Sequence, residues 1–123
     1  MDYVTDRKRA VGLGSAKEGT HHFWSMQISS MALAILMPLF IFTFGQILGA
    51  PFEEVIAYFS RPFPALVAAA SIVVGFMHFK SGVQVLIEDY THGLTRSSLI
   101  IGTTILSYAA AGTGLFAIAR IAL

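Results

Sequence analysis

The chain has 123 residues, of which 55% are hydrophobic and 12% are charged, whereas a typical soluble domain carries about 25% charged residues. Seven of its charged residues fall within the first 18 positions, so the rest of the chain has too few to cover a water-soluble surface. This composition excludes a soluble enzyme, a nucleic-acid-binding domain and a disordered chain. Because the sequence has no cysteine, disulfides and iron–sulfur ligation by this chain are excluded as well.

A polar N-terminal segment, residues 1–21, comes before a transmembrane domain that we place at residues 22–123. Three long stretches of this domain contain no Asp, Glu, Lys or Arg, namely residues 28–52, 62–79 and 97–119. A helix of about 20 apolar residues crosses a hydrocarbon core of roughly 30 Å, and each stretch with its apolar flanks is long enough. The sequence therefore predicts an all-α integral membrane protein, with transmembrane helices near residues 22–48, 64–89 and 97–121.

Prolines and glycines agree with these boundaries. Pro51 follows the first predicted span, and Pro62 and Pro64 stand in the first turn of the second, where proline is tolerated. Residues 91–98 are predicted to form a short turn between antiparallel helices. Pro38 lies inside the first span, and we expect it to kink that helix because it removes one backbone hydrogen bond.

Lysine and arginine near the ends of the spans place the N-terminus on the inner side and the C-terminus outside. The deciding residues are Arg7, Lys8, Arg9 and Lys17 before the first span and Arg96 after the second. Trp24 and Tyr90 then mark the inner interface, and Tyr58 lies near the outer one. Because acids are interspersed with the basic residues at the start, a bacterial inner membrane is favoured over a mitochondrial one with a transit peptide.

Small residues recur at a spacing of four along the spans, which lets helices approach closely. The pairs are Gly45/Gly49, Ser71/Gly75, Ser107/Ala111 and Ala110/Gly114. The pattern indicates helix packing and names no partner.

His78 stands deep in the second span, and an ionisable group inside a membrane is a functional candidate. The alternative is a neutral histidine that hydrogen-bonds to a neighbouring helix. His78, Gly82 and Asp89 share one helix face at positions i, i+4 and i+11. A planar macrocycle ligated by His78 would find room beside Gly82, although close helix packing explains this glycine equally well. Haem b in a bilayer is held by axial histidines, and with only His78 this deep, a second ligand must come from another protein.

A second polar cluster is predicted where the first span begins and the second ends, over residues 19–30 and 88–92. Hydroxyl, amide, imidazole and phenol groups at one membrane depth suit a quinone, whose carbonyls accept hydrogen bonds. An ordinary interfacial belt with helix caps is the simpler interpretation of the same residues.

The segment from His78 to Tyr90 resembles the second-helix signature of the family of small hydrophobic membrane anchors of succinate dehydrogenase, with its glycine at Gly82 and its Asp-Tyr pair at Asp89 and Tyr90. The entry into the first span, from Gly19 through His21-His22-Phe23-Trp24 to Ser29, is similar to the same family. By position, the resemblance implies that His78 is an axial ligand of haem b, that Tyr90 hydrogen-bonds a ubiquinone carbonyl beside Asp89, and that His21 lies near the haem propionates.

Two positions depart from the family pattern. Gln27 stands where arginine approaches a haem propionate, so here the residue can donate a hydrogen bond but no charge. Lys80, two residues after His78, is unusual at this depth. Either it extends toward the inner interface or its charge partly replaces that of the missing arginine.

The resemblance further implies a subunit that is not catalytic alone, in a complex that passes electrons from succinate to ubiquinone in the respiratory chain and the tricarboxylic acid cycle. Its partners would be a second membrane anchor of a different type, which shares haem b, an iron–sulfur subunit and a flavoprotein subunit. Alternatives are the anchor of a fumarate reductase, a small oligomeric proton-coupled transporter with His78 and Asp89 as a relay, and a structural subunit with an unliganded His78.

Overall fold

The computed structural model describes residues 3–14 and 19–123, which form five α-helices and no strand. The helices are α1 (Asp6–Val11), α2 (Gly19–Gly45), α3 (Phe52–Phe59), α4 (Pro62–Tyr90) and α5 (Gly93–Ala122). Three of them, α2, α4 and α5, are long and apolar enough to cross a membrane. The prediction of an all-α membrane protein with three spans is therefore confirmed. Lys17, part of the predicted basic segment, lies outside the described residues.

The observed spans begin earlier than the predicted ones, and α4 and α5 also end slightly later. Helix α2 runs from Gly19 to Gly45, and α4 runs from Pro62 to Tyr90. The predicted turn over residues 91–98 is wrong, because only Thr91 and His92 separate α4 from α5. Gly93 adopts a positive φ of 63°, which glycine tolerates without a steric penalty, so the chain reverses and the next helix begins at once.

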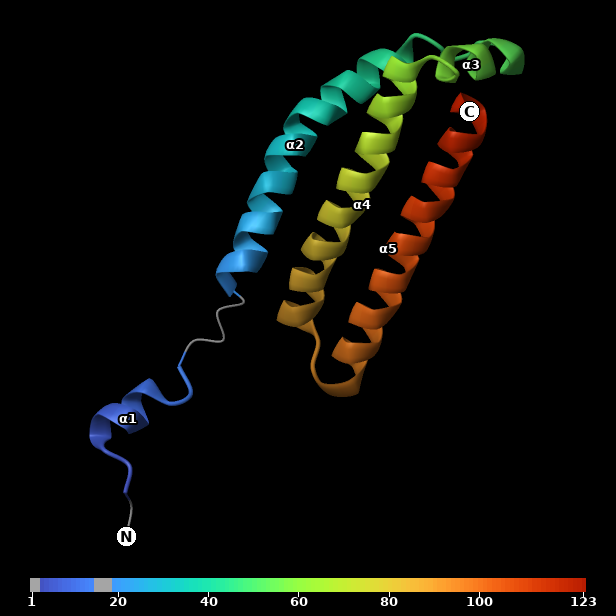
Figure 1. The fold of residues 1–123 in the computed structure, drawn as a ribbon. Helices are drawn as coiled ribbons and strands as arrows, with labels where there is room; N and C mark the ends of the chain where they lie inside the picture. The colour runs from blue at the N-terminus through green and yellow to red at the C-terminus, as the bar shows by residue number, and fades with distance from the viewer. Residues whose placement is uncertain (1–2, 15–18) are drawn as a thin grey trace.

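Helix α2 stays helical through Pro38. Figure 1 shows this helix bowed along its length, whereas α4 and α5 run straighter beside it. Since proline lacks the backbone N–H and its ring crowds the preceding turn, we attribute the bow to Pro38.

Helix α3 is not among the predicted elements. Its apolar residues Phe52, Val55, Ile56 and Phe59 follow a helical repeat, and acidic residues stand in its first turn. Phe59 is buried at the end of the spans, in a cluster with Ile47 and Ala68. The helix lies across the end of the layer of spans, as Figure 1 shows.

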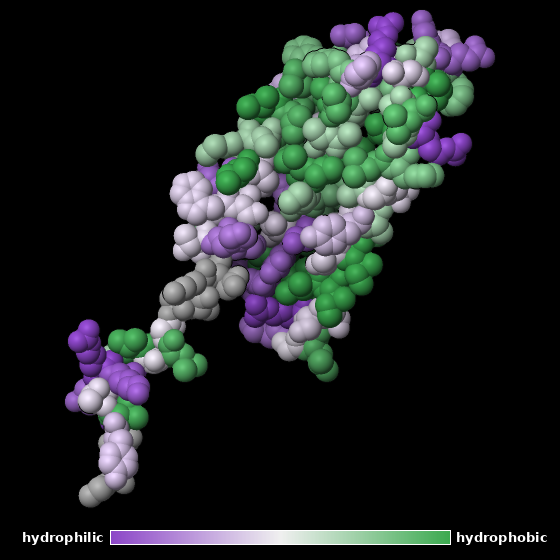
Figure 2. Space-filling model, in the orientation of Figure 1, coloured by the Kyte–Doolittle hydropathy of each residue, from purple (hydrophilic) through white to green (hydrophobic). Residues whose placement is uncertain are grey.

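Helix α4 lies between the other two spans. Both α2 and α5 pack against it, and among the described residues no Cα atom of α2 lies within 8 Å of a Cα atom of α5 (Figure 1). The three spans thus form one layer with two open faces. Only 22% of the most apolar stretch of α4 is buried, and 6% in α2 and in α5. Figure 2 shows the resulting apolar surface over the spans, with hydrophilic residues gathered toward the ends.

The contact between α4 and α5 is close at one glycine. A Cβ atom built on Gly114 would lie 3.1 Å from Cδ1 of Ile72, and Ser107, two turns earlier on α5, is also buried. Among the predicted small-residue pairs, Ala110/Gly114 therefore contains a true packing glycine. A Cβ built on Gly75 would meet nothing within 4 Å.

We predict that Gly114→Leu destabilises the chain by about 1–3 kcal/mol, because the new side chain must displace Ile72 in a packed seam. Gly112→Leu is the matched control, since a Cβ at Gly112 meets nothing within 4 Å on the same helix. Thermal unfolding of the full chain in detergent micelles, followed by circular dichroism, gives the comparison. Equal melting temperatures for the two variants would contradict the close contact between Gly114 of α5 and Ile72 of α4.

Candidate functional site

His78 of α4 faces α2 and is partly buried there. Its ring atom Nδ1 lies 3.0 Å from Oγ of Ser29. The Ser29 hydroxyl in turn lies 2.9 Å from the carbonyl oxygen of Met26 and donates to it. The sequence analysis offered, as one of two interpretations, a histidine that hydrogen-bonds to a neighbouring helix. The contact between Nδ1 and Ser29 is such a hydrogen bond. The second ring nitrogen, Nε2, is not used by this contact.

The side of α4 next to His78 is open at Gly82. A Cβ atom built on Gly82 would meet nothing within 4 Å, and the same holds for Gly75, seven residues earlier on α4. Neither α2 nor α5 therefore packs closely against these two glycines. Within this chain, Gly82 leaves space beside His78 and does not serve as a helix-packing glycine.

Two hollows flank the contact between the first half of α2 and α4. The larger has a volume of about 510 Å³ and also reaches α5. It is lined by His21, Trp24, Ser25, Ile28, Ser29 and Ala32 of α2, by Val74, Met77, Lys80 and Ser81 of α4, and by Tyr108 of α5. The smaller, of about 310 Å³, is lined by Gly19, His22, Phe23, Met26, Gln27 and Ser30 of α2 and by Val85 of α4.

The structure does not bring His21 and Gln27 together. His21 lines the larger hollow and Gln27 the smaller one. Six residues along a helix rotate a side chain by about 240°, so the two point to different sides of α2. A shared role near one pair of haem propionates stays a prediction for both residues.

Lys80 points toward α5. Its Nζ lies 5.8 Å from the centre of the Tyr108 ring, a cation–π contact of the kind worth about 0.5–1 kcal/mol at exposed sites. Lys80 and His21 line the same hollow, which does not include Gln27. The positive charge is therefore placed on the side of His21 and not beside the glutamine.

Asp89 and Tyr90 lie at the C-terminal end of α4, and both side chains are exposed, Tyr90 by 80%. They line neither of the two hollows. The topology brings them to the same end of the layer as the start of α2 (Figure 1). Within this chain, however, they do not share a pocket with His21.

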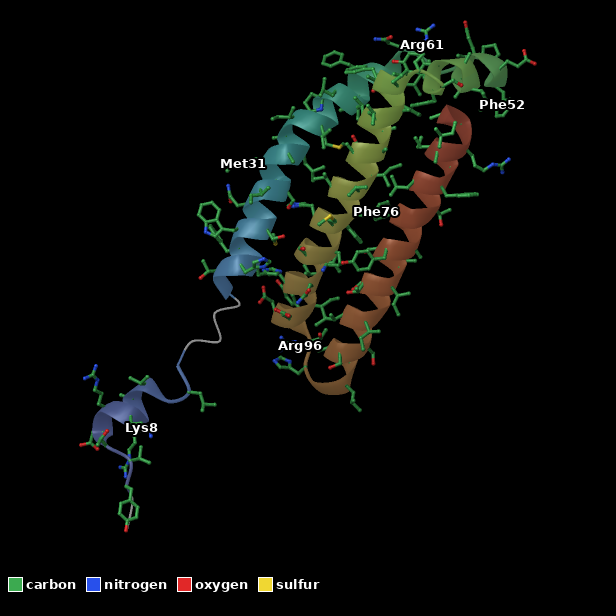
Figure 3. All side chains as sticks on the ribbon, viewed as in Figure 1. Lys8, Met31, Phe52, Arg61, Phe76 and Arg96 are labelled. Atoms are coloured by element: carbon green, nitrogen blue, oxygen red, sulfur yellow. The ribbon has the colours of Figure 1, made fainter. Side chains whose placement is uncertain are left out.

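An ion pair at this end was not predicted as such. Arg96 of α5 lies 3.4 Å from Glu88 of α4, and Gln84 Nε2 donates to the same carboxylate oxygen at 3.0 Å. Arg96 lies beside the turn between α4 and α5 in Figure 3, far from Arg61 at the other end. The spacing of four between Gln84 and Glu88 was the available signal. The ion pair between Glu88 and Arg96 could have been predicted only if the turn between α4 and α5 were known to have two residues.

Among the described residues, no group of three His, Asp or Glu side chains is arranged to hold a metal ion. A single imidazole such as that of His78 is sufficient on one side of a haem, whose iron takes its other ligands from the macrocycle and from the opposite side.

Three spans in an open layer, with an intramembrane histidine facing one neighbour, define a small multi-span membrane subunit whose faces other proteins or lipid must cover. Residues 1–118 match the family described as the succinate dehydrogenase/fumarate reductase transmembrane subunit. The chain belongs to this family and is a membrane anchor subunit of the succinate dehydrogenase type.

The relatives agree in name. The chain is 45% identical to the succinate dehydrogenase hydrophobic membrane anchor subunit of Paracoccus denitrificans, over 100% of this chain and 95% of the relative. It is 28% identical to the subunit of the same name from Rickettsia bellii, over 86% of each chain. The corresponding Rickettsia conorii subunit is 26% identical over 81% of each. No solved structure matches the chain.

Proposed function

We propose that this anchor subunit holds haem b from one side through Nε2 of His78 and takes part in ubiquinone reduction by succinate dehydrogenase. The observation that carries the proposal is the contact between His78 Nδ1 and Ser29 Oγ at 3.0 Å. An imidazole whose Nδ1–H is donated to a neighbour keeps its lone pair on Nε2, which is the form that ligates a metal.

The residues around His78 fit a flat macrocycle. Gly82 and Gly75 leave open space along α4, and the apolar surroundings suit a porphyrin. When bound, haem b supplies a one-electron carrier inside the membrane. This chain would present Nε2 of His78 to the haem and would exclude water from one side of the site.

The open faces of the layer support the proposed assembly. The second axial ligand would come from a second membrane anchor of a different type that covers α4. The iron–sulfur and flavoprotein subunits would dock at the end that carries Asp89 and Tyr90, because electrons must reach the quinone there. Both side chains are exposed in this chain, as groups that meet a partner or a ligand are.

For quinone binding, Tyr90 would donate its phenol hydrogen to a ubiquinone carbonyl, and Asp89 would shape the site beside it. His21 and Gln27 stay candidates for the haem propionates, each from its own hollow. The family description covers both succinate dehydrogenase and fumarate reductase, so it does not distinguish the direction of the reaction. The three relatives are all named as succinate dehydrogenase subunits, which supports succinate oxidation.

The proposed location is a bacterial inner membrane with the N-terminus in the cytoplasm. Arg7, Lys8 and Arg9 come before the first span, and Arg96 lies in the first turn of α5, at the same end of the layer as the start of α2 (Figure 3). This distribution is typical of an inside N-terminus.

We predict that His78→Ala abolishes the b-type signal of this complex in reduced-minus-oxidised spectra, because the axial nitrogen is lost. The measurement uses the purified complex, with the flavin and the partner chains quantified to show that assembly persists. A wild-type complex with no b-haem, or an unchanged spectrum in the variant, would refute the proposed ligand.

Gly82→Leu is predicted to lower the ratio of haem to flavin in the purified complex, because the new side chain fills the space beside His78. The melting temperature of the chain alone should not fall, since a Cβ at position 82 meets no side chain and no neighbouring helix within 4 Å among the described residues. Pyridine haemochrome quantification measures the first effect. Full haem content in the variant would show that this space is not used by the macrocycle.

Tyr90→Phe is predicted to slow ubiquinone reduction by about 10-fold or more, since a hydrogen bond to the quinone that strengthens as charge develops is lost. Succinate oxidation with an artificial acceptor should be preserved, because that acceptor bypasses the quinone site. If quinone reduction stays normal, Tyr90 acts only as an anchor at the membrane interface.

A further inference from the structure

We propose that Ser29 is the positioning residue for His78, fixing both the tautomer and the plane of its ring so that Nε2 is the nitrogen presented for ligation. This inference rests on the proposed function, because it concerns how the haem ligand is prepared. It assigns a role to a residue on α2, 49 positions away in the chain from the histidine it contacts.

The direction of the hydrogen bond follows from the number of hydrogens available. The Ser29 hydroxyl has a single hydrogen, and the Met26 carbonyl 2.9 Å away can only accept one. When the hydroxyl donates to Met26, its oxygen is left as an acceptor toward the ring. The 3.0 Å contact to His78 Nδ1 is then an N–H donation from the imidazole.

The hydrogen bond to the Met26 carbonyl does not by itself distinguish Ser29, because the neighbouring Ser30 makes it too. Ser30 Oγ also donates to the Met26 carbonyl, at 2.8 Å, but its side chain is exposed and lines the smaller hollow. Hydroxyls inside helices commonly bond back to such carbonyls. Only Ser29 combines this bond with a contact to the histidine of the adjacent helix.

The cost of losing this contact is set by its surroundings. His78 lies about 18 Å along the helix axis from the end of α4 at Tyr90, which puts it well inside the apolar layer. An imidazole N–H without an acceptor is costly in such surroundings. Without Ser29, the ring is free to rotate or to exchange tautomer in search of another acceptor, and Nε2 is no longer held in one place.

The bond also affects the electronic character of the ligand. Donation from Nδ1 makes the imidazole more basic at Nε2, and outer partners of this kind tune both affinity and redox potential. The two consecutive hydrogen bonds, from the imidazole to Ser29 and from Ser29 to the Met26 carbonyl, strengthen each other through polarisation. A more basic ligand favours ferric iron, so removing Ser29 should raise the midpoint potential of the haem.

The test uses the intact complex purified with four substitutions in this chain. Ser29→Ala removes the acceptor, while Ser29→Thr and Ser29→Val form a pair of nearly equal shape that differ in the hydroxyl. Ser30→Ala is the matched control, because it removes a bond to the same carbonyl without touching His78. Potentiometric titration gives the haem midpoint potential, low-temperature EPR gives the geometry of the ferric haem, and transfer to apomyoglobin gives the rate of haem loss.

We expect Ser29→Ala and Ser29→Val to raise the midpoint potential, to shift or broaden the EPR signal and to speed haem loss about 10-fold or more. Ser29→Thr and Ser30→Ala should behave like the unmodified complex. The inference is overturned if Ser29→Ala changes neither the potential nor haem loss, or if Ser29→Thr changes them as much as Ser29→Val does.

Failure of this inference can be told apart from failure of the proposed function. If haem is absent from the unmodified complex, or is retained with the same spectrum in His78→Ala, the proposed ligand is wrong. If haem depends on His78 but is indifferent to the hydroxyl at position 29, the ligand stands and the role of Ser29 is refuted.

Discussion

Helix α4 packs against α2 on one side and against α5 on the other, and among the described residues the backbones of these two do not approach within 8 Å. At 100° per residue, side chains two positions apart on α4 point about 200° apart. His78 accordingly meets Ser29 of α2, while Lys80 lies over the Tyr108 ring of α5. One central helix thus directs the imidazole of His78 and the ammonium group of Lys80 toward separate neighbours.

Two kinds of glycine distinguish the inside of this chain from its outside. Gly114 is where α5 comes so close to α4 that a methyl group would press on Ile72, so this glycine belongs to the fold. Gly82 and Gly75 face open space, so no contact within the described part of the chain explains why they are small. In a membrane, an apolar face can be covered by lipid at little cost. Small residues beside an ionisable group on such a face leave room for the proposed haem or for another subunit.

The three spans were predictable because the charge-free stretches are long and the membrane allows few folds other than helices. The largest error in a predicted boundary is at the start of α5. Gly93 reverses the chain, so α5 begins four residues before the predicted start. Helix α3 was missed because it is short, although its apolar repeat and its acidic first turn were readable.

The site was predictable only along single helices. The face shared by His78 and Gly82 follows from helix geometry, and so does the separation of His21 from Gln27, which the resemblance alone did not indicate. The hydrogen-bond partner of His78 could not be predicted from the sequence, because the contact with Ser29 depends on how α2 is rotated against α4. The placement of Lys80 over Tyr108 depends in the same way on how α5 packs.

In the proposed haem site, His78 is held at Nδ1 by Ser29 and would present Nε2 to the haem iron. The most direct measurement is an electron cryo-microscopy structure of the complex purified with its partner subunits. We predict haem density with iron at Nε2 of His78, Ser29 within hydrogen-bond distance of Nδ1, and the macrocycle beside Gly82. An intact complex in which His78 packs against protein or lipid, with no haem next to it, would contradict this claim.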